Sequence, residues 1–208
     1  MSKPLDHTLE RRLHAMAARL AAEYEGMFSR ETVDAVVVDS LGRLGSISIT
    51  THLPVIVERF ARERLRAVAR TTGLLPRQRP LLLFVCAQNA ARSQMAAALA
   101  RHVSGGRVEV MSAGSDPAGA INATVVDVIA ELGIELAVEF PKPLTDEVVR
   151  AADVVVTMGC GDVCPVLDGP RYLDWAVADP AGQDLETVRR IRQDIADHVL
   201  DLLKELLP

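Results

Sequence analysis

Residues 81–93 constrain the fold of this 208-residue chain more than any other segment. An unbroken apolar run, Leu81–Cys86, is followed by five residues and then by Arg92 and Ser93, which open a helix-favouring stretch. Such a short apolar run is typical of a strand buried on both faces of a parallel sheet. The sequence therefore predicts a strand over 81–86, a loop, and a helix over 93–103, with a cysteine where the strand ends.

This loop has the composition of an anion site. Its backbone N–H groups can surround the emerging sulfur of Cys86, and the N-terminus of the following helix adds its positive end. These dipoles and the Arg92 guanidinium favour the thiolate form, and Ser93 can donate a hydrogen bond to it. The planar fork of Arg92 matches two oxygens of a phosphate-like ion. We therefore predict a nucleophilic Cys86 beneath a tetrahedral-oxyanion site formed by Ala87, Gln88, Asn89, Ala90, Ala91, Arg92 and Ser93.

The rest of the C-terminal part alternates between strand and helix patterns. We expect strands over 108–112, 154–158 and 171–174, and helices over 123–132, 146–152 and 185–207. This order predicts an α/β domain over 81–208, with a four-stranded parallel sheet flanked by helices. Ligands of such sheets bind at the carboxyl ends of the strands, where Cys86 is expected.

The N-terminal part predicts a different architecture. Apolar residues at helical spacing indicate a helix over 6–26, a second helix capped by Ser29, and a third that starts at Thr50 or Thr51 and has Val55, Phe60 and Leu65 in its apolar stripe. We expect a three-helix bundle over 1–75, whose apolar residues could support a homodimer. The arginines between 59 and 70 are expected to form a solvated face rather than a nucleic-acid surface.

Charge supports a boundary between the two parts. Residues 1–80 carry a balance of +4 and residues 81–208 a balance of −9. The change falls at the proline- and arginine-bearing connector 73–80. No apolar run approaches the length of a membrane span, and the N-terminus lacks the pattern of a signal peptide. Three cysteines do not form a secreted disulfide framework, so we expect a cytoplasmic protein with reduced thiols.

Two further cysteines and an aspartate follow the later strands. Cys160 and Cys164, separated by three residues in a glycine-bearing turn, follow the strand over 154–158. No histidine lies near them in the sequence, so we predict no metal site and favour a redox-active thiol pair. Asp179 precedes a proline, which keeps it out of helical geometry, and it could donate a proton to an oxygen leaving the oxyanion site.

Together these segments resemble the low-molecular-weight tyrosine phosphatase superfamily, and more closely its arsenate reductase branch. The resemblance covers residues 81–208 and is carried by Cys86 to Ala96, Ser112-Ala113-Gly114, Pro141 to Thr145, Val156 to Asp162, and Asp174 to Gly182. It implies a nucleophile at Cys86, an oxyanion clamp at Arg92, a thiolate partner at Ser93, a loop-supporting Asn89 and a general acid at Asp179. Ala97 stands near the position where some reductases have an acidic residue beside a potassium ion, which argues against that site here.

The resemblance implies an arsenate reductase for arsenic detoxification, with phosphate as a competing oxyanion and no bound cofactor. The electrons would come from an external reductant, either thioredoxin or mycothiol with a mycoredoxin- or glutaredoxin-like donor. The thiol that attacks Cys86 could be Cys160, Cys164 or an external one. The alternative is a protein tyrosine phosphatase, but Ala181-Gly182 rather than an aromatic residue follows Asp179-Pro180, and aromatic residues make up only 3% of the chain.

Overall fold

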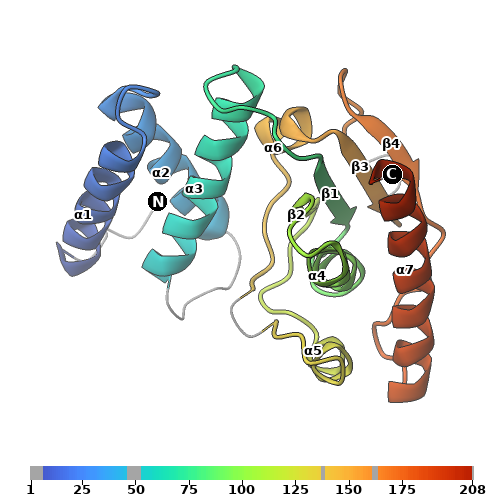
Figure 1. The fold of residues 1–208 in the computed structure, drawn as a ribbon. Coiled ribbons are helices and arrows are strands. Elements are labelled where there is room, and N and C mark those ends of the chain that lie inside the picture. The colour runs from blue at the N-terminus through green and yellow to red at the C-terminus, as the bar shows by residue number, and fades with distance from the viewer. Residues whose placement is uncertain (1–6, 46–52, 137–138, 161–163, 208) are drawn as a thin grey trace. The chain divides into compact units, whose positions relative to one another are not determined.

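The computed structural model describes residues 7–45, 53–136, 139–160 and 164–207 (Figure 1). The chain divides into two compact units, one ending at Pro76 and one beginning at Arg77. The first contains only helices among its described residues, and the second contains the sheet. None of the helices in the described ranges is long and apolar enough to cross a membrane.

The N-terminal unit consists of α1 (His7–Glu23), α2 (Arg30–Gly45) and α3 (Leu53–Thr71). Three helices before the sheet were expected, and this is confirmed. The hydroxyl of Ser29 accepts a hydrogen bond from the Thr32 backbone nitrogen at 3.2 Å, so Ser29 caps α2 as predicted. The predicted start of the third helix, at Thr50 or Thr51, lies outside the described residues. Apolar side chains from all three helices are fully buried, among them Met16, Leu20, Val33, Leu44, Val57, Phe60 and Leu65.

Two expectations for the third helix are wrong. Val55 is 58% exposed, because the buried stripe of α3 follows the spacing of Val57, Phe60, Ala61 and Leu65, and Val55 falls outside it. The arginines do not form one solvated face, since Arg64 and Arg70 are buried.

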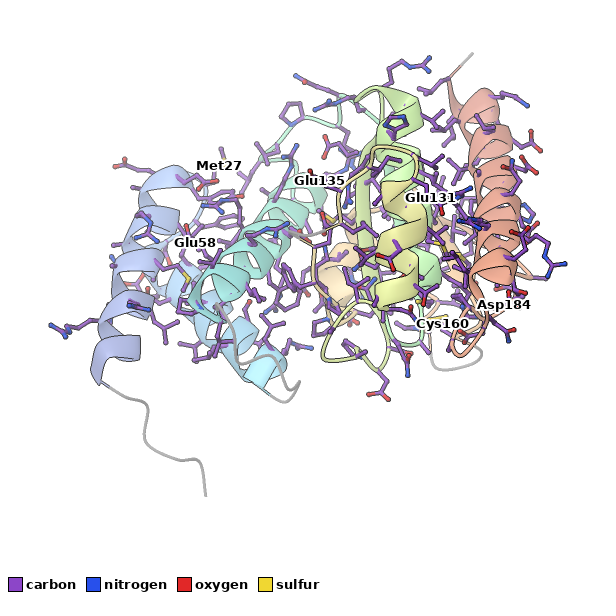
Figure 2. All side chains as sticks on the ribbon, turned by 90° about the horizontal axis from the view of Figure 1, so that it is seen from below. Met27, Glu58, Glu131, Glu135, Cys160 and Asp184 are labelled. Carbon is purple, nitrogen blue, oxygen red and sulfur yellow. A yellow bond between two sulfur atoms is a disulfide. The ribbon has the colours of Figure 1, made fainter. Side chains whose placement is uncertain are left out.

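Arg64 is buried because it lies one turn after Phe60 and so shares the buried face of α3. Its guanidinium lies over the Phe60 ring, 5.5 Å from the centroid. Its charge is met by a carboxylate oxygen of Asp39 at 2.7 Å and by the Ser40 hydroxyl at 2.9 Å. Other charges of this unit pair nearer the surface, as Glu58 does with Arg19 and Arg62 (Figure 2).

The C-terminal unit is built on a four-stranded sheet, which confirms the predicted α/β fold class. Its strands are β1 (Leu81–Cys86), β2 (Glu109–Gly114), β3 (Val154–Met158) and β4 (Arg171–Asp174), in the order β2-β1-β3-β4. All neighbouring pairs are parallel, and every residue of β1 is buried. β2 runs to Gly114, beyond the predicted end at Ser112, because its last residue still pairs with Cys86.

Helices complete this unit (Figure 1). α4 (Arg92–Ser104) and α7 (Leu185–Leu206) pack against each other, and α5 (Ala123–Ala130) packs on α7, whereas α6 (Asp146–Ala151) contacts β1. The Asp184 carboxylate caps α7 by accepting a hydrogen bond from the Thr187 nitrogen at 2.7 Å (Figure 2). The core includes Phe84, Met95, Val156, Trp175 and Ile195. This packing fixes β1 and α4, the two elements that flank the loop after Cys86.

Candidate functional site

Cys86 is held from both sides by the sheet. As the last residue of β1, it pairs with Gly114 of β2 and with Met158 of β3. The loop that follows it carries Ala87 to Ala91, and α4 begins at Arg92. The carbonyl oxygens of Ala87, Gln88 and Ala90 accept hydrogen bonds from the backbone nitrogens of Asp116, Ala118 and Asn122, at 2.8, 3.0 and 2.9 Å. These bonds fix the peptide planes of the loop, as a preorganised anion site requires.

Gly114 has a position that only glycine can occupy without displacement of the loop. A Cβ atom there would lie 2.6 Å from the Ala87 carbonyl oxygen and 2.8 Å from the Asn89 nitrogen. The loop therefore passes directly over the end of β2. The sequence contained Gly114 in the segments carrying the resemblance, but nothing in the sequence indicated this close approach.

Asn89 supports the loop from within. It is fully buried and has φ 47°, a left-handed conformation that asparagine tolerates better than most residues. Its amide nitrogen donates to the Ser93 hydroxyl at 2.8 Å. Its amide oxygen accepts from the Lys142 backbone nitrogen at 2.8 Å and from the Gln94 side chain at 3.1 Å. Gln94 and Lys142 were not predicted as site residues, although a lysine in the apolar run around residues 140–144 was a signal of burial.

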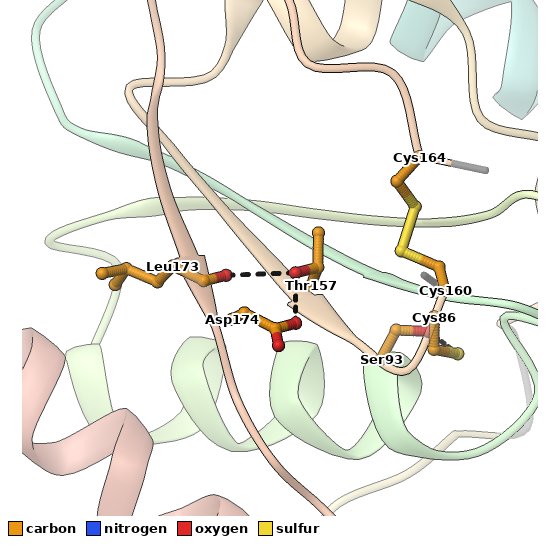
Figure 3. Close-up of a disulfide and its surroundings, with 7 residues drawn as sticks. All are labelled: Cys86, Ser93, Thr157, Cys160, Cys164, Leu173 and Asp174. Carbon is orange, nitrogen blue, oxygen red and sulfur yellow. Dashed lines mark hydrogen bonds between the residues drawn. A yellow bond between two sulfur atoms is a disulfide. The ribbon is translucent and has the colours of Figure 1, made fainter. Parts of the chain in front are cut away.

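Ser93 lies next to Cys86, the predicted nucleophile. Its hydroxyl oxygen is 3.0 Å from the Cys86 sulfur (Figure 3). Because the Asn89 amide nitrogen can only donate, Ser93 accepts there and keeps its own hydrogen for the sulfur. Cys86 is only 3% exposed, so a thiolate at this position needs such donors in place of water. The first turn of α4 adds the positive end of the helix.

The predicted clamp and the predicted acid are in contact. A terminal nitrogen of Arg92 lies 2.9 Å from a carboxylate oxygen of Asp179, and the Asp179 side chain is 56% exposed. The other Asp179 oxygen accepts from the Ala181 nitrogen at 2.9 Å. Gly159, with φ +69°, lies against the same guanidinium: a Cβ atom on it would be 2.5 Å from Arg92. A glycine directly after β3 therefore gives Arg92 its room.

The remaining two cysteines form a disulfide. Cys160 and Cys164 are bonded, with their Cα atoms 5.9 Å apart, while Cys86 is a free thiol (Figure 3). Cys160 comes two residues after Met158, the strand partner of Cys86. Cys160 is 7% exposed, and Cys164 is half-buried. The pair thus has a buried residue near the end of β3 and a more exposed residue four positions later. Within the described ranges, no group of three or more histidine, cysteine or carboxylate side chains could hold a metal ion.

Two family models match the chain. Residues 81–207 match the low molecular weight phosphotyrosine protein phosphatase family, and residues 13–69 match the family described as protein-tyrosine-phosphatase-like, N-terminal domain. The first match covers more than half of the chain and contains every residue of the site described above.

Known relatives extend this comparison. A putative arsenate reductase of Halobacterium salinarum is 38% identical over 130 residues, which are 60% of this chain and 92% of the relative. A glutaredoxin arsenate reductase of a Synechocystis species is 30% identical over 128 residues, 60% of this chain and 97% of the relative. Among solved structures, a thioredoxin-dependent arsenate reductase of Corynebacterium glutamicum is 42% identical, with a TM-score of 0.84 over 94% of this chain and 96% of its own. The chain therefore belongs to the low-molecular-weight phosphotyrosine protein phosphatase family, and within it to the arsenate reductases.

Proposed function

We propose that this protein reduces arsenate to arsenite through a thiolate at Cys86 and a thiol–disulfide relay through Cys160 and Cys164. The observation that carries the proposal is the disulfide on the segment directly after β3, the strand whose last residue pairs with Cys86. Hydrolysis of a phosphate ester moves no electrons and has no use for a dithiol. Reduction of arsenic(V) needs two electrons, which is what one thiol pair supplies on becoming a disulfide.

In the binding step, the loop 87–93 holds arsenate by its backbone N–H groups and the Arg92 fork. The Cys86 thiolate attacks arsenic and forms a sulfur–arsenic bond, while one arsenate oxygen leaves as water. Asp179 supplies the proton for that oxygen, and its contact with Arg92 at 2.9 Å supports its position beside the bound anion. Ser93 and Asn89 support the thiolate through the chain of hydrogen bonds that ends on its sulfur.

In the relay, Cys160 attacks the sulfur of Cys86. The sulfur–arsenic bond breaks, its electron pair stays on arsenic, and arsenite leaves with arsenic in the +3 state. Cys164 then attacks Cys160, which frees Cys86 and produces the Cys160–Cys164 disulfide. From sequence either cysteine, or an external thiol, could act first. The buried position of Cys160 and the half-buried position of Cys164 favour the order Cys160, then Cys164.

An external reductant closes the cycle. A thioredoxin-type protein is our first choice, and mycothiol with a glutaredoxin-type donor is the alternative. The solved reductase of Corynebacterium glutamicum is named thioredoxin-dependent, and the Synechocystis relative is named for glutaredoxin. Phosphate should compete with arsenate because both are tetrahedral anions. A cytoplasmic location and a homodimer formed through the helical unit remain part of the proposal, and sedimentation of the full chain tests the second.

A coupled assay tests the function. Arsenate should drive NADPH oxidation in the presence of thioredoxin and its reductase, with arsenite as product. Cys86→Ser should lower this rate by more than about a thousandfold, because a serine hydroxyl is not ionised at neutral pH. After a single turnover without reductant, mass spectrometry of Cys164→Ser should find a Cys86–Cys160 disulfide, and Cys160→Ser should release no arsenite.

The same protein preparation tests the alternative activity, that of a tyrosine phosphatase. A tyrosine phosphatase would hydrolyse p-nitrophenyl phosphate efficiently and would keep that activity in the Cys160→Ser and Cys164→Ser variants. Fast hydrolysis without arsenate-dependent NADPH oxidation would replace the proposed reductase with a phosphatase.

A further inference from the structure

An exposed apolar side chain follows Cys164, the half-buried cysteine of the disulfide. Val166, two residues after Cys164, is 80% exposed, the largest exposed fraction among the large apolar side chains of the described ranges. Exposure of single apolar residues is ordinary on protein surfaces. Its place two residues after Cys164, a half-buried residue that forms a disulfide, is the informative feature.

The backbone around Val166 is held in place. The Leu167 nitrogen donates a hydrogen bond to the Tyr172 hydroxyl at 2.8 Å, and that hydroxyl lies 3.2 Å from the Leu167 carbonyl oxygen, to which it donates. Tyr172 belongs to β4 and pairs with Val155 of β3. On the other side, Pro165 has a fixed φ. Val166 is thus presented by a segment tied to the sheet on one side and to Cys164 on the other.

Reduction of the disulfide requires attack from outside. Cys160 is 7% exposed and Cys164 is half-buried, so we expect an incoming thiolate to attack Cys164. That thiolate bonds to the Cys164 sulfur, and Cys160 leaves as a thiolate. A second thiol of the reductant then attacks the mixed disulfide and expels the Cys164 thiolate. Two electrons pass from the dithiol, which becomes a disulfide, to the Cys160–Cys164 pair.

On the basis of the proposed function, we infer that Val166 is the docking contact for a protein dithiol of the thioredoxin type. A small thiol reaches a sulfur without an apolar contact, whereas a protein must cover the surface around that sulfur. A dithiol fits better than a donor acting through a small thiol, because the bond to be reduced lies within one chain. Covering Val166 removes its apolar surface from water, which favours the complex.

The test is Val166→Asp in the full chain, assayed with thioredoxin, its reductase and NADPH. The KM for thioredoxin should rise by at least about tenfold, since the variant loses apolar burial and places a charge in the contact. Turnover with dithiothreitol should stay within about twofold, as should arsenite released in a single turnover without reductant. Val166→Ile should keep the wild-type KM for thioredoxin, because it retains an apolar side chain. Leu200→Asp is the matched control: Leu200 is 38% exposed on α7, and its replacement should leave the KM for thioredoxin unchanged.

The outcomes separate this inference from the function on which it rests. An unchanged KM for thioredoxin in Val166→Asp, with arsenite still formed, overturns the docking contact and leaves the reductase intact. Equal losses with thioredoxin and dithiothreitol also overturn it, because the substitution then acts on the relay and not on a partner. If the wild-type chain forms no arsenite with any reductant, the proposed function itself fails.

Discussion

Each unit buries a polar network, and the two networks differ in where their hydrogen bonds end. In the helical unit, Arg64 is 7% exposed, and it bonds to Asp39 and Ser40 of the neighbouring helix α2. In the sheet-containing unit, a chain of donors passes from Lys142 and Gln94 through Asn89 to Ser93 and ends on the Cys86 sulfur.

The bonds named for the first network join one helix to another. The second ends on an atom that we propose to react. Buried polar groups need partners in both cases, because an unpaired one costs about 1–3 kcal/mol. The same requirement can therefore be met for stability alone, or in a way that also presents a donor to a proposed nucleophile. Changes in the first network should therefore appear in the free energy of unfolding, and changes in the second in the rate.

Among substitutions that leave the three cysteines in place, the largest effect is expected for Gly159→Ala. The new methyl group would lie 2.5 Å from the Arg92 guanidinium, which must move. The kcat/KM for arsenate should fall by about a hundredfold, the scale of a misplaced oxyanion donor. The affinity for phosphate, measured by protection of Cys86 from alkylation, should fall with it.

Gly133→Ala is the matched control for this variant. Gly133 has φ +72°, close to that of Gly159, but nothing lies within 4 Å of its would-be Cβ atom. It therefore introduces the same backbone strain without a clash. An equal loss of kcat/KM in both variants would show that strain and not the Arg92 contact is responsible.

The parts of the site that lie close in the sequence could be predicted from it. Cys86, Arg92 and Ser93 are brought together by a strand, a short loop and a helix, all visible as local patterns. Asp179 could be added because the carboxyl ends of parallel strands share one edge of the sheet. The four-stranded sheet followed from the alternation of apolar strands with helices.

The supporting contacts could not be predicted, because they join segments by tertiary packing alone. The bond from Lys142 to Asn89 spans 53 residues, and no local pattern specifies it. The close approach of Gly114 to the loop is equally a product of packing. The prediction of a solvated Arg64 was wrong for a related reason. A charged residue in an arginine-rich run was expected at the surface, and only tertiary packing brings it to its partner Asp39 on α2.

A smaller effect is expected for Asn89→Gly. Glycine adopts the φ of 47° without strain but removes the amide that holds Ser93, Gln94 and Lys142. The rate of a single turnover should fall by about tenfold, and iodoacetamide should alkylate Cys86 more slowly at pH 7. Asn89→Ala should be slower still, since alanine adds strain at this φ. A wild-type alkylation rate in Asn89→Gly would contradict a role of this network in activating the sulfur.

The smallest effect belongs to the network around Arg64 and depends on pH. Hydrogen bonds from Arg43 and Arg64 hold the pKa of Asp39 below its usual value, against the opposing effect of partial burial. A lowered folded-state pKa stabilises the fold above the unfolded pKa of about 4, and this stabilisation is lost as pH falls through the folded value. The Asp39 side chain is 48% exposed, so solvent screening keeps the contribution below about 1 kcal/mol. Asp39→Asn should therefore lower the Tm of the full chain at pH 7, followed by circular dichroism at 222 nm, and the difference from wild type should shrink below pH 4.

Asp34→Asn is the control, since Asp34 pairs only with Arg30 among the ion pairs of the described helices, one turn away on the surface of α2. A Tm difference for Asp39→Asn that stays constant down to pH 3 would mean that packing, and not the charge on Asp39, holds Arg64 in place.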